Sequence, residues 1–147
     1  MRWSGVAAAG AAAGEDGHGA ALMESAAWAC VSVAIEEFGV VLGHGVVVVC
    51  GPGSNGGDGL AIARRFDGLG VSVEVVLVGQ VADLNESARM QWDIASALGL
   101  SLREAPAEEP LAFASRSWAR KGLVIDALFG TGLSRPVTGV GAAAVLA

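Results

Sequence analysis

The chain has 147 residues, of which 53% are hydrophobic and 16% are charged, a balance typical of one folded domain and unlike that of a disordered chain. Nine basic and 15 acidic residues give a net charge of −6, which argues against nucleic acid as a partner because nucleic-acid binders present a basic face. The best candidate for a membrane span, residues 26–35, is only about half as long as a spanning helix, so we expect no membrane association.

The N-terminus differs in composition from the rest of the chain. Residues 1–14 are rich in alanine and glycine, and we expect residues 1–20 to be poorly ordered, ahead of one domain at residues 21–147. Cys30 and Cys50 lie in apolar stretches without the spacing of a metal site. They predict buried free thiols in a reducing compartment, and hence a cytoplasmic protein.

Helical and strand patterns alternate from Leu22 onward. Apolar residues at three- and four-residue steps predict a first helix that ends with Gly39 as its C′ residue. The run Val46–Cys50 predicts a strand buried on both faces, followed by a glycine loop at residues 51–57. Further on, we expect a helix at 58–69 closed by Gly70, a strand at 73–78, a helix at 85–98 closed by Gly99 and a short strand at 100–104. Pro106 and Pro110 mark a loop. The last expected elements are a helix at 111–120, a strand at 123–126 and a helix at 142–147.

This alternation predicts an α/β fold: a Rossmann-like, three-layer αβα arrangement around a mainly parallel sheet. We expect the strands that begin at Val46 and Leu123 to be neighbours where the strand order reverses, because ligands bind at the carboxyl ends of strands at such a point. Residues 51–58 and 126–136 would then lie on opposite sides of one crevice. The sequence contains no strand to follow 123–126, so we expect the sheet to be incomplete at its C-terminal side, as in a fragment.

The glycine loop carries the chemistry that can be interpreted from residues alone. Gly51, Gly53 and Gly56 match GxGxxG between a strand and a helix, where backbone N–H groups bind phosphate. The chain lacks the Lys of a Walker A loop and the acidic residues that dehydrogenases and methyltransferases carry near theirs. Asp58 is either a helix N-cap or a ligand contact, and Asn55 either occupies a left-handed turn or is functional.

Two long motifs resemble a known family. Residues 49–64, VCGPGSNGGDGLAIAR, and 124–136, VIDALFGTGLSRP, are similar to the YjeF N-terminal domain family, the NAD(P)H-hydrate epimerases, and Leu22-Met23-Glu24 is similar to its LMExAG helix. The resemblance implies a Rossmann-like fold and epimerisation of the R- and S-forms of hydrated NADH and NADPH (NADHX and NADPHX) in nicotinamide nucleotide repair. Departures from the family pattern are Ser54 for the first Asn of NNGGD, Ser25, Ala27 and the absence of a downstream D-x-P-S-G segment.

The resemblance also implies site residues and partners. Asp126 would be the acid/base, and a potassium ion would be the cofactor, held by Asn55 and Asp126. Partners would be the dinucleotide substrate and either a second copy in a homodimer or a fused C-terminal dehydratase domain. The substrate would be bound by residues of both motifs: Ser54, Asn55, Gly56, Gly57, Asp58, Gly130, Thr131, Gly132, Leu133, Ser134, Arg135 and Pro136.

Other interpretations of these residues remain open. The same fold can serve as a non-catalytic binding or scaffold module, and this chain can be an inactive fragment of an enzyme. A different Rossmann-like enzyme that uses a nucleotide or S-adenosylmethionine is a further alternative. At the level of single residues, Asp126 can cap the turn that follows it, and Arg135 can be an ordinary solvated charge instead of a phosphate contact.

Overall fold

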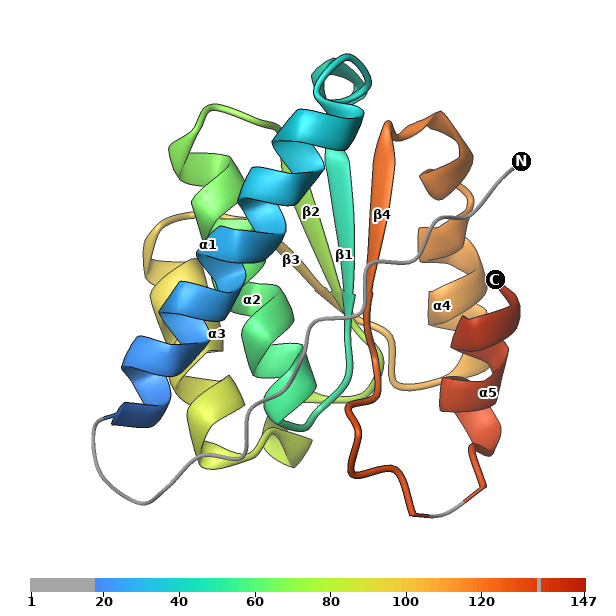
Figure 1. The fold of residues 1–147 in the computed structure, drawn as a ribbon. Helices are drawn as coiled ribbons and strands as arrows, with labels where there is room; N and C mark the ends of the chain where they lie inside the picture. The colour runs from blue at the N-terminus through green and yellow to red at the C-terminus, as the bar shows by residue number, and fades with distance from the viewer. Residues whose placement is uncertain (1–17, 135) are drawn as a thin grey trace.

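A computed structural model describes residues 18–134 and 136–147. Its four parallel strands are arranged in the order β3-β2-β1-β4, and they are β1 (Val46–Cys50), β2 (Val73–Leu77), β3 (Ser101–Glu104) and β4 (Leu123–Ala127). One face of the sheet is covered by α1 (His18–Phe38), α2 (Ser54–Gly68) and α3 (Glu86–Ala97), and the other by α4 (Glu108–Ser115) and α5 (Gly139–Leu146) (Figure 1). Of the N-terminus expected to be poorly ordered, residues 1–17 lie outside the described residues.

The architecture confirms the predicted three-layer αβα fold with a parallel sheet. β1 and β4 are direct neighbours, with Val46 opposite Leu123 and Cys50 opposite Ala127. The chain runs outward from β1 to β2 and β3, then crosses back to place β4 on the other side of β1. The strand order therefore reverses between β1 and β4, which is where ligands bind in open parallel sheets.

Alternation along β1 divides the core into two layers. Val46, Val48 and Cys50 pack toward α1 and α2, whereas Val47 and Val49 pack toward the side of α4 and α5. All five residues of the strand are buried. A strand covered by helices on both faces needs apolar residues at every position, which explains the uninterrupted run in the sequence.

Several helix boundaries differ from those predicted. The helix expected at 58–69 begins at Ser54, and the one expected at 142–147 begins at Gly139. The helix expected at 111–120 begins at Glu108, so that Pro110 lies in its first turn, where the missing N–H of proline costs no hydrogen bond. That helix ends at Ser115, and a separate 3₁₀ turn follows at Trp118–Arg120.

Glycine closes two of the helices as predicted but not the first. Gly70 and Gly99 both have φ of +79° and follow α2 and α3. Gly39 follows α1 without a positive φ, so its predicted role as a left-handed C′ residue is wrong. There the chain turns through a hydrogen bond from the Val41 N–H to the Phe38 carbonyl, which needs no left-handed residue.

The two cysteines form no disulfide bond. Cys50 is buried at the end of β1, where burial raises the pKa of its thiol. Cys30 is only half-buried, so the prediction that both thiols are buried holds for one of them. No helix in the part of the chain that the structure describes has the length and apolar character to cross a bilayer.

Candidate functional site

A groove of about 440 Å³ lies at the carboxyl ends of β1 and β4. One side consists of residues 52–55 after β1, and the other consists of residues 128–133 after β4. These are parts of the two motifs singled out in the sequence. The structure thus brings the two predicted loops together across one groove, as the position of the strand reversal requires.

Close backbone contacts join the two sides and explain two of the glycines. The Gly51 N–H donates to the Ala127 carbonyl at 3.0 Å, and a Cβ on Gly51 would lie 2.1 Å from the Leu128 carbonyl oxygen. A Cβ on Gly56 would lie 1.8 Å from the Gly51 carbonyl oxygen. Side chains cannot fit at these distances, so α2 can begin directly against the end of β1 only if both positions are glycine.

The groove is built around the N-terminus of α2. Gly53 is the N-cap and has no side chain that could accept from the first turn, and the Gly57 N–H donates to its carbonyl at 3.2 Å. The N–H groups of residues 54–56 have no carbonyl within the helix to bond. These N–H donors and the positive end of the helix dipole favour an anionic group here, and the described residues that line the groove include no basic side chain.

Asn55 connects the two motifs through its side chain. Its Nδ2 donates to the Phe129 carbonyl at 3.1 Å, so Oδ1, on the opposite side of the amide, points away from that carbonyl. The side chain is 9% exposed, and Oδ1 is buried with no partner among the described residues. The backbone of Asn55 is helical, so the structure excludes the left-handed turn considered from the sequence. A buried carbonyl oxygen beside a groove can accept from a ligand donor or coordinate a cation.

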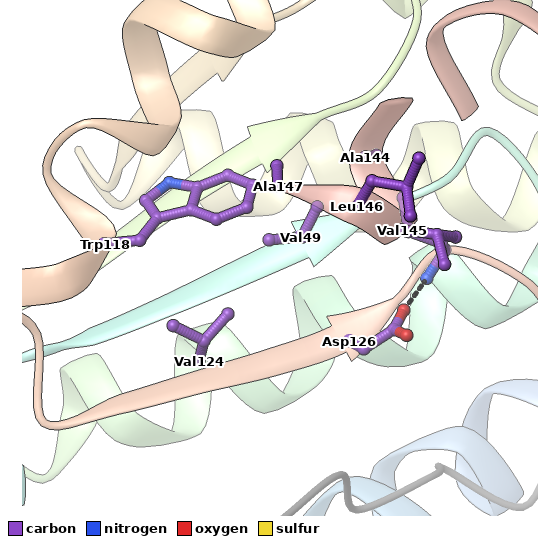
Figure 2. A pocket seen from close by; sticks show the side chains of 9 residues that line it. Val49, Trp118, Val124, Asp126, Ala144, Val145, Leu146 and Ala147 are labelled. Atoms are coloured by element: carbon purple, nitrogen blue, oxygen red, sulfur yellow. Dashed lines mark hydrogen bonds between the residues drawn. The ribbon is translucent and has the colours of Figure 1, made fainter. Parts of the chain in front are cut away.

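Asp126 does not line this groove. Its side chain belongs to the face of β4 directed at α4 and α5, because Asp126 pairs with Val49 in the sheet. There it lines a second pocket of about 200 Å³ together with Trp118 and residues 144–147 (Figure 2). Oδ1 accepts the Leu128 N–H at 2.9 Å, so the side chain does cap the following turn. Leu128 lines both the groove and the second pocket, and the two spaces are therefore adjacent.

Asp58 lies in the second turn of α2, so it is not the N-cap considered from the sequence. It is 7% exposed, and burial raises the pKa of its carboxyl to about 6. Burial together with the nearby Asp58 carboxylate raises the pKa of the Cys30 thiol, which places Asp58 toward α1. Asp58 is not among the residues that line the groove.

The remaining predicted substrate residues fall into two groups. Ser54 and residues 130–133 line the groove, whereas Gly56 and Gly57 are buried within α2 and pack its first turn. Ser134 and Pro136 follow the lining residues without belonging to them, and Arg135 lies outside the described residues. No group of three or more His, Cys, Asp or Glu residues that could hold a metal occurs in the described ranges.

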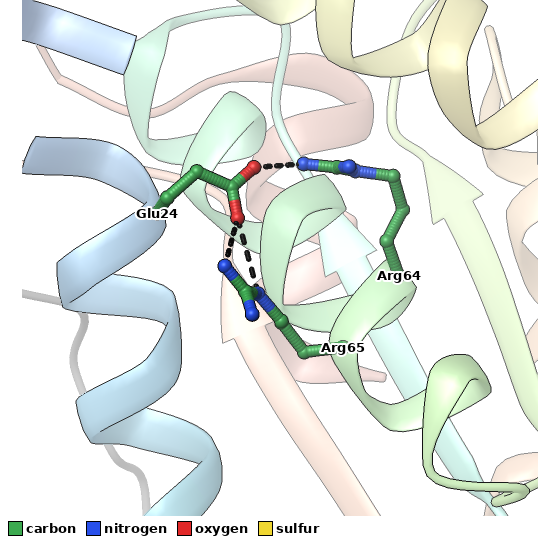
Figure 3. Close-up of polar contacts among 3 residues, drawn as sticks. All are labelled: Glu24, Arg64 and Arg65. Carbon is green, nitrogen blue, oxygen red and sulfur yellow. Dashed lines mark hydrogen bonds and ion pairs between the residues drawn. The ribbon is translucent and has the colours of Figure 1, made fainter. Parts of the chain in front are cut away.

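Glu24, from the predicted LME motif, has a structural position away from the groove. Its carboxylate accepts from Arg65 Nη2 at 2.7 Å and Nε at 3.1 Å, and also from Arg64, both on α2 (Figure 3). Burial acts to raise the pKa of Glu24, but the hydrogen bonds from Arg65 and Arg64 outweigh it, so the pKa lies below its ordinary value. The ion pairs fasten α1 to α2.

Two contributors to the site were missed from the sequence. The Phe129 carbonyl orients Asn55, and backbone carbonyls leave no trace in a residue pattern. Asn85 contacts Ser54 from the start of α3. An Asn directly before a helical segment is an N-cap signal that could have drawn attention to it, although the contact itself depends on the tertiary fold.

Comparison with known proteins gives consistent matches. Residues 19–147 match the family described as YjeF-related protein N-terminus. The chain is 38% identical over 119 residues to the bifunctional NAD(P)H-hydrate repair enzyme Nnr of Thermofilum pendens, covering 81% of this chain and 22% of that relative. It is 37% identical over 129 residues to the NAD(P)H-hydrate epimerase of Rhodobacter capsulatus, covering 84% of this chain and 57% of that relative. The crystal structure of a yeast protein shares the fold, with a TM-score of 0.66 and 22% identity, covering 81% of this chain and 50% of that chain.

Proposed function

Because this chain belongs to the family of YjeF-related protein N-terminal domains, we propose that it epimerises the R- and S-forms of NADHX and NADPHX in nicotinamide nucleotide repair. The observation that carries the proposal is the hydrogen bond between Asn55 and the Phe129 carbonyl, which joins both motifs around one groove. Relatives named as NAD(P)H-hydrate epimerases support the same reaction. Substrate phosphate would lie on the N–H groups of residues 54–56, with further contacts from residues 130–133 across the groove.

The reaction requires one acid/base group. The substrate's C6 is a hemiaminal carbon, which bears a hydroxyl group beside the ring nitrogen. The nitrogen lone pair expels the hydroxyl as water once a carboxylic acid protonates it, and the ring becomes a planar iminium. Water then adds to either face while the resulting carboxylate takes its proton, so that one carboxyl group completes the cycle. We assign this role to Asp126, which lies at the end of β4.

The position of Asp126 determines how the substrate must lie. Its carboxylate opens on the second pocket, so a ligand whose phosphate occupies the groove reaches it only by extending past Leu128. We therefore propose that the nicotinamide ring enters the second pocket while the phosphate stays at α2. In that arrangement the ring would lie among the side chains that line the second pocket, beside the Asp126 carboxyl group.

Potassium is the proposed cofactor, with Asn55 and Asp126 as the residues that would hold it. The Asn55 Oδ1, which has no partner in the part of the chain that the structure describes, is the kind of oxygen that an alkali cation accepts as a ligand. Asp126 would have to turn from the Leu128 N–H to contribute. When bound, the ion would supply positive charge that neutralises phosphate and orders the carbonyls of the groove.

Partners and location complete the proposal. We propose that the domain acts with a fused C-terminal dehydratase domain, in agreement with the name of the bifunctional relatives, or as a homodimer. The chain spans 22% of the length of one such relative and 57% of an epimerase relative. Cytoplasmic location is supported by two cysteines that form no disulfide.

The test is conversion of pure R-NADHX to the S-form, followed by chromatography, with native protein and Asp126→Asn. The native chain should catalyse the conversion, and the variant should lose at least about 100-fold in kcat while its melting temperature stays within a few degrees. Asp67→Asn, an exposed carboxylate near the end of α2, is the matched control and should be fully active.

A non-catalytic binding module is the second candidate. It is favoured by the Asp126 side chain, which is satisfied by the Leu128 N–H and lies outside the groove. That alternative predicts that the native chain binds nicotinamide mononucleotide but converts no NADHX. Full activity of Asp126→Asn would instead remove Asp126 from the mechanism and leave the epimerase assignment in place.

A further inference from the structure

A small hydrogen-bond network joins the start of α3 to the groove. Asn85 is the N-cap of α3, and its Oδ1 accepts the Ala88 N–H at 2.9 Å and the Ser87 hydroxyl at 3.1 Å. Both partners are donors, so they fix the amide with its oxygen toward α3 and its nitrogen toward α2. Nδ2 then donates to Ser54 Oγ at 3.1 Å, while the backbone N–H of Asn85 donates to the Pro52 carbonyl, also at 3.1 Å.

This contact determines what Ser54 can offer a ligand. A serine hydroxyl has one hydrogen and two lone pairs, and Asn85 occupies one of the lone pairs. The hydroxyl hydrogen is therefore directed away from Asn85 and remains free to donate. Ser54 lines the groove in the first turn of α2, beside backbone N–H groups without partners in the helix. This end of the groove consequently presents hydrogen-bond donors, whereas Asn55 presents an acceptor, Oδ1, that has no partner among the described residues.

We propose that Asn85 is a positioning residue that holds the Ser54 hydroxyl as a hydrogen-bond donor to the phosphate of the ligand. The inference rests on the proposed function and names a residue outside both motifs that acts through Ser54. The arrangement depends on a hydroxyl at this position, because only a hydroxyl can accept from Asn85 and donate to a ligand with the same atom.

Asn85→Asp tests the proposal because it separates the two roles of the side chain. The carboxylate still accepts the Ala88 N–H and, at a helix N-terminus, is as good a cap as asparagine. It has no hydrogen to give Ser54, so it accepts the Ser54 hydroxyl hydrogen and reverses the bond. KM for NADHX should rise about tenfold and kcat should stay within about twofold, because the lost contact binds substrate and transition state alike. The melting temperature should not fall.

Three companion measurements exclude a merely structural effect. Asn85→Thr keeps a neutral cap that cannot reach Ser54 and should raise KM about threefold. Ser87→Ala removes a hydrogen bond from the other end of Asn85 and should leave KM unchanged. In a Ser54→Ala background, the fold-increase in KM caused by Asn85→Asp should be at least about threefold smaller than in the native chain, because no hydroxyl remains whose hydrogen bond could be reversed.

The outcomes separate this inference from the proposed function. Native KM in Asn85→Asp, in a protein that epimerises NADHX, overturns the positioning role alone. A fall in kcat together with a lower melting temperature would show that Asn85 only caps α3, and would also overturn it. If the native chain neither converts NADHX nor binds nicotinamide mononucleotide by calorimetry, the proposed function fails and the inference fails with it.

Discussion

Asn55 carries an energetic cost that the fold alone does not explain. Leaving a buried carbonyl oxygen without a partner costs about 1–3 kcal/mol, and such groups are rare in folded proteins. Its amide nitrogen is satisfied by Phe129, so the amide cannot rotate to satisfy the oxygen without losing that bond. An oxygen held in this way beside a groove is most simply understood as a ligand contact, and a ligand would remove the cost.

Asp58 makes stability depend on pH. Burial raises the pKa of its carboxyl to about 6, so the folded state binds the proton more tightly than the unfolded chain does. Stability from this group is therefore complete below the unfolded pKa, near 4, and is lost as the pH rises through 6. Asp58→Asn stays neutral at all pH values, and we expect it to match the native chain at pH 3.5 and to exceed it by about 1–2 kcal/mol at pH 7.5.

Urea unfolding across this pH range measures the difference between variant and native protein. Asp67→Asn, at an exposed position on the same helix, serves as the control and should show no such dependence. If the advantage of Asp58→Asn is the same at both ends of the range, the carboxyl titrates normally and the buried environment assigned to it is wrong.

The direction of Asp126 is the residue-scale feature that the sequence could not supply. Its place at the carboxyl end of a strand was predictable from the apolar run that precedes it. Which face it occupies depends on the register of β4 against β1, where it pairs with Val49. A one-residue change of register would turn it to the other face, and a run apolar at every position does not specify that choice.

At the scale of elements, the start of α2 shows how tertiary contacts override local preference. Glycine disfavours helix by about 1 kcal/mol per residue relative to alanine, so the Gly56-Gly57 pair predicts a loop and not a first turn. The structure forms a helix there because the turn lies directly against the ends of β1 and β4. The glycines are needed for this close approach, and the helical conformation follows from it.

Gly56→Ala tests whether that approach is essential. Its new Cβ would lie 1.8 Å from the Gly51 carbonyl oxygen, a backbone atom that cannot move without displacing β1. We expect the free energy of unfolding to fall by about 3 kcal/mol or more. Gly68→Ala, at the end of the same helix with nothing within 4 Å, is the matched control and should raise it by up to about 1 kcal/mol. Equal effects of both substitutions in chemical denaturation would contradict the close packing at the groove.

At the scale of the whole molecule, the parts that follow from chain periodicity were predictable. The strands predicted at Val46–Cys50 and at residues 123–126, separated by alternating helices, are enough to place β1 beside β4 and the two motifs at one edge. The contacts that complete the site are tertiary and leave weak signals. Asn85 reaches Ser54 over 31 positions of sequence, and Glu24 reaches Arg64 over 40.

The charge of the whole chain agrees with the way the groove is built. A protein with a net charge of −6 repels a nucleotide at long range, and none of the described residues that line the groove is basic. Binding then depends on short-range donors: backbone N–H groups of α2 and the Ser54 hydroxyl. Such donors select phosphate by geometry, which suits a site that must hold one end of a ligand while the other end reacts.

One ligand should span the groove and the second pocket. A crystal structure of the chain with nicotinamide mononucleotide tests it most directly. We expect phosphate oxygens on the N–H groups of residues 54–56 and the nicotinamide ring beyond Leu128, with the Asp126 carboxylate within hydrogen-bond reach directly or through one water. Phosphate bound elsewhere, or a ring held away from Asp126 while that side chain stays on the Leu128 N–H, would contradict it.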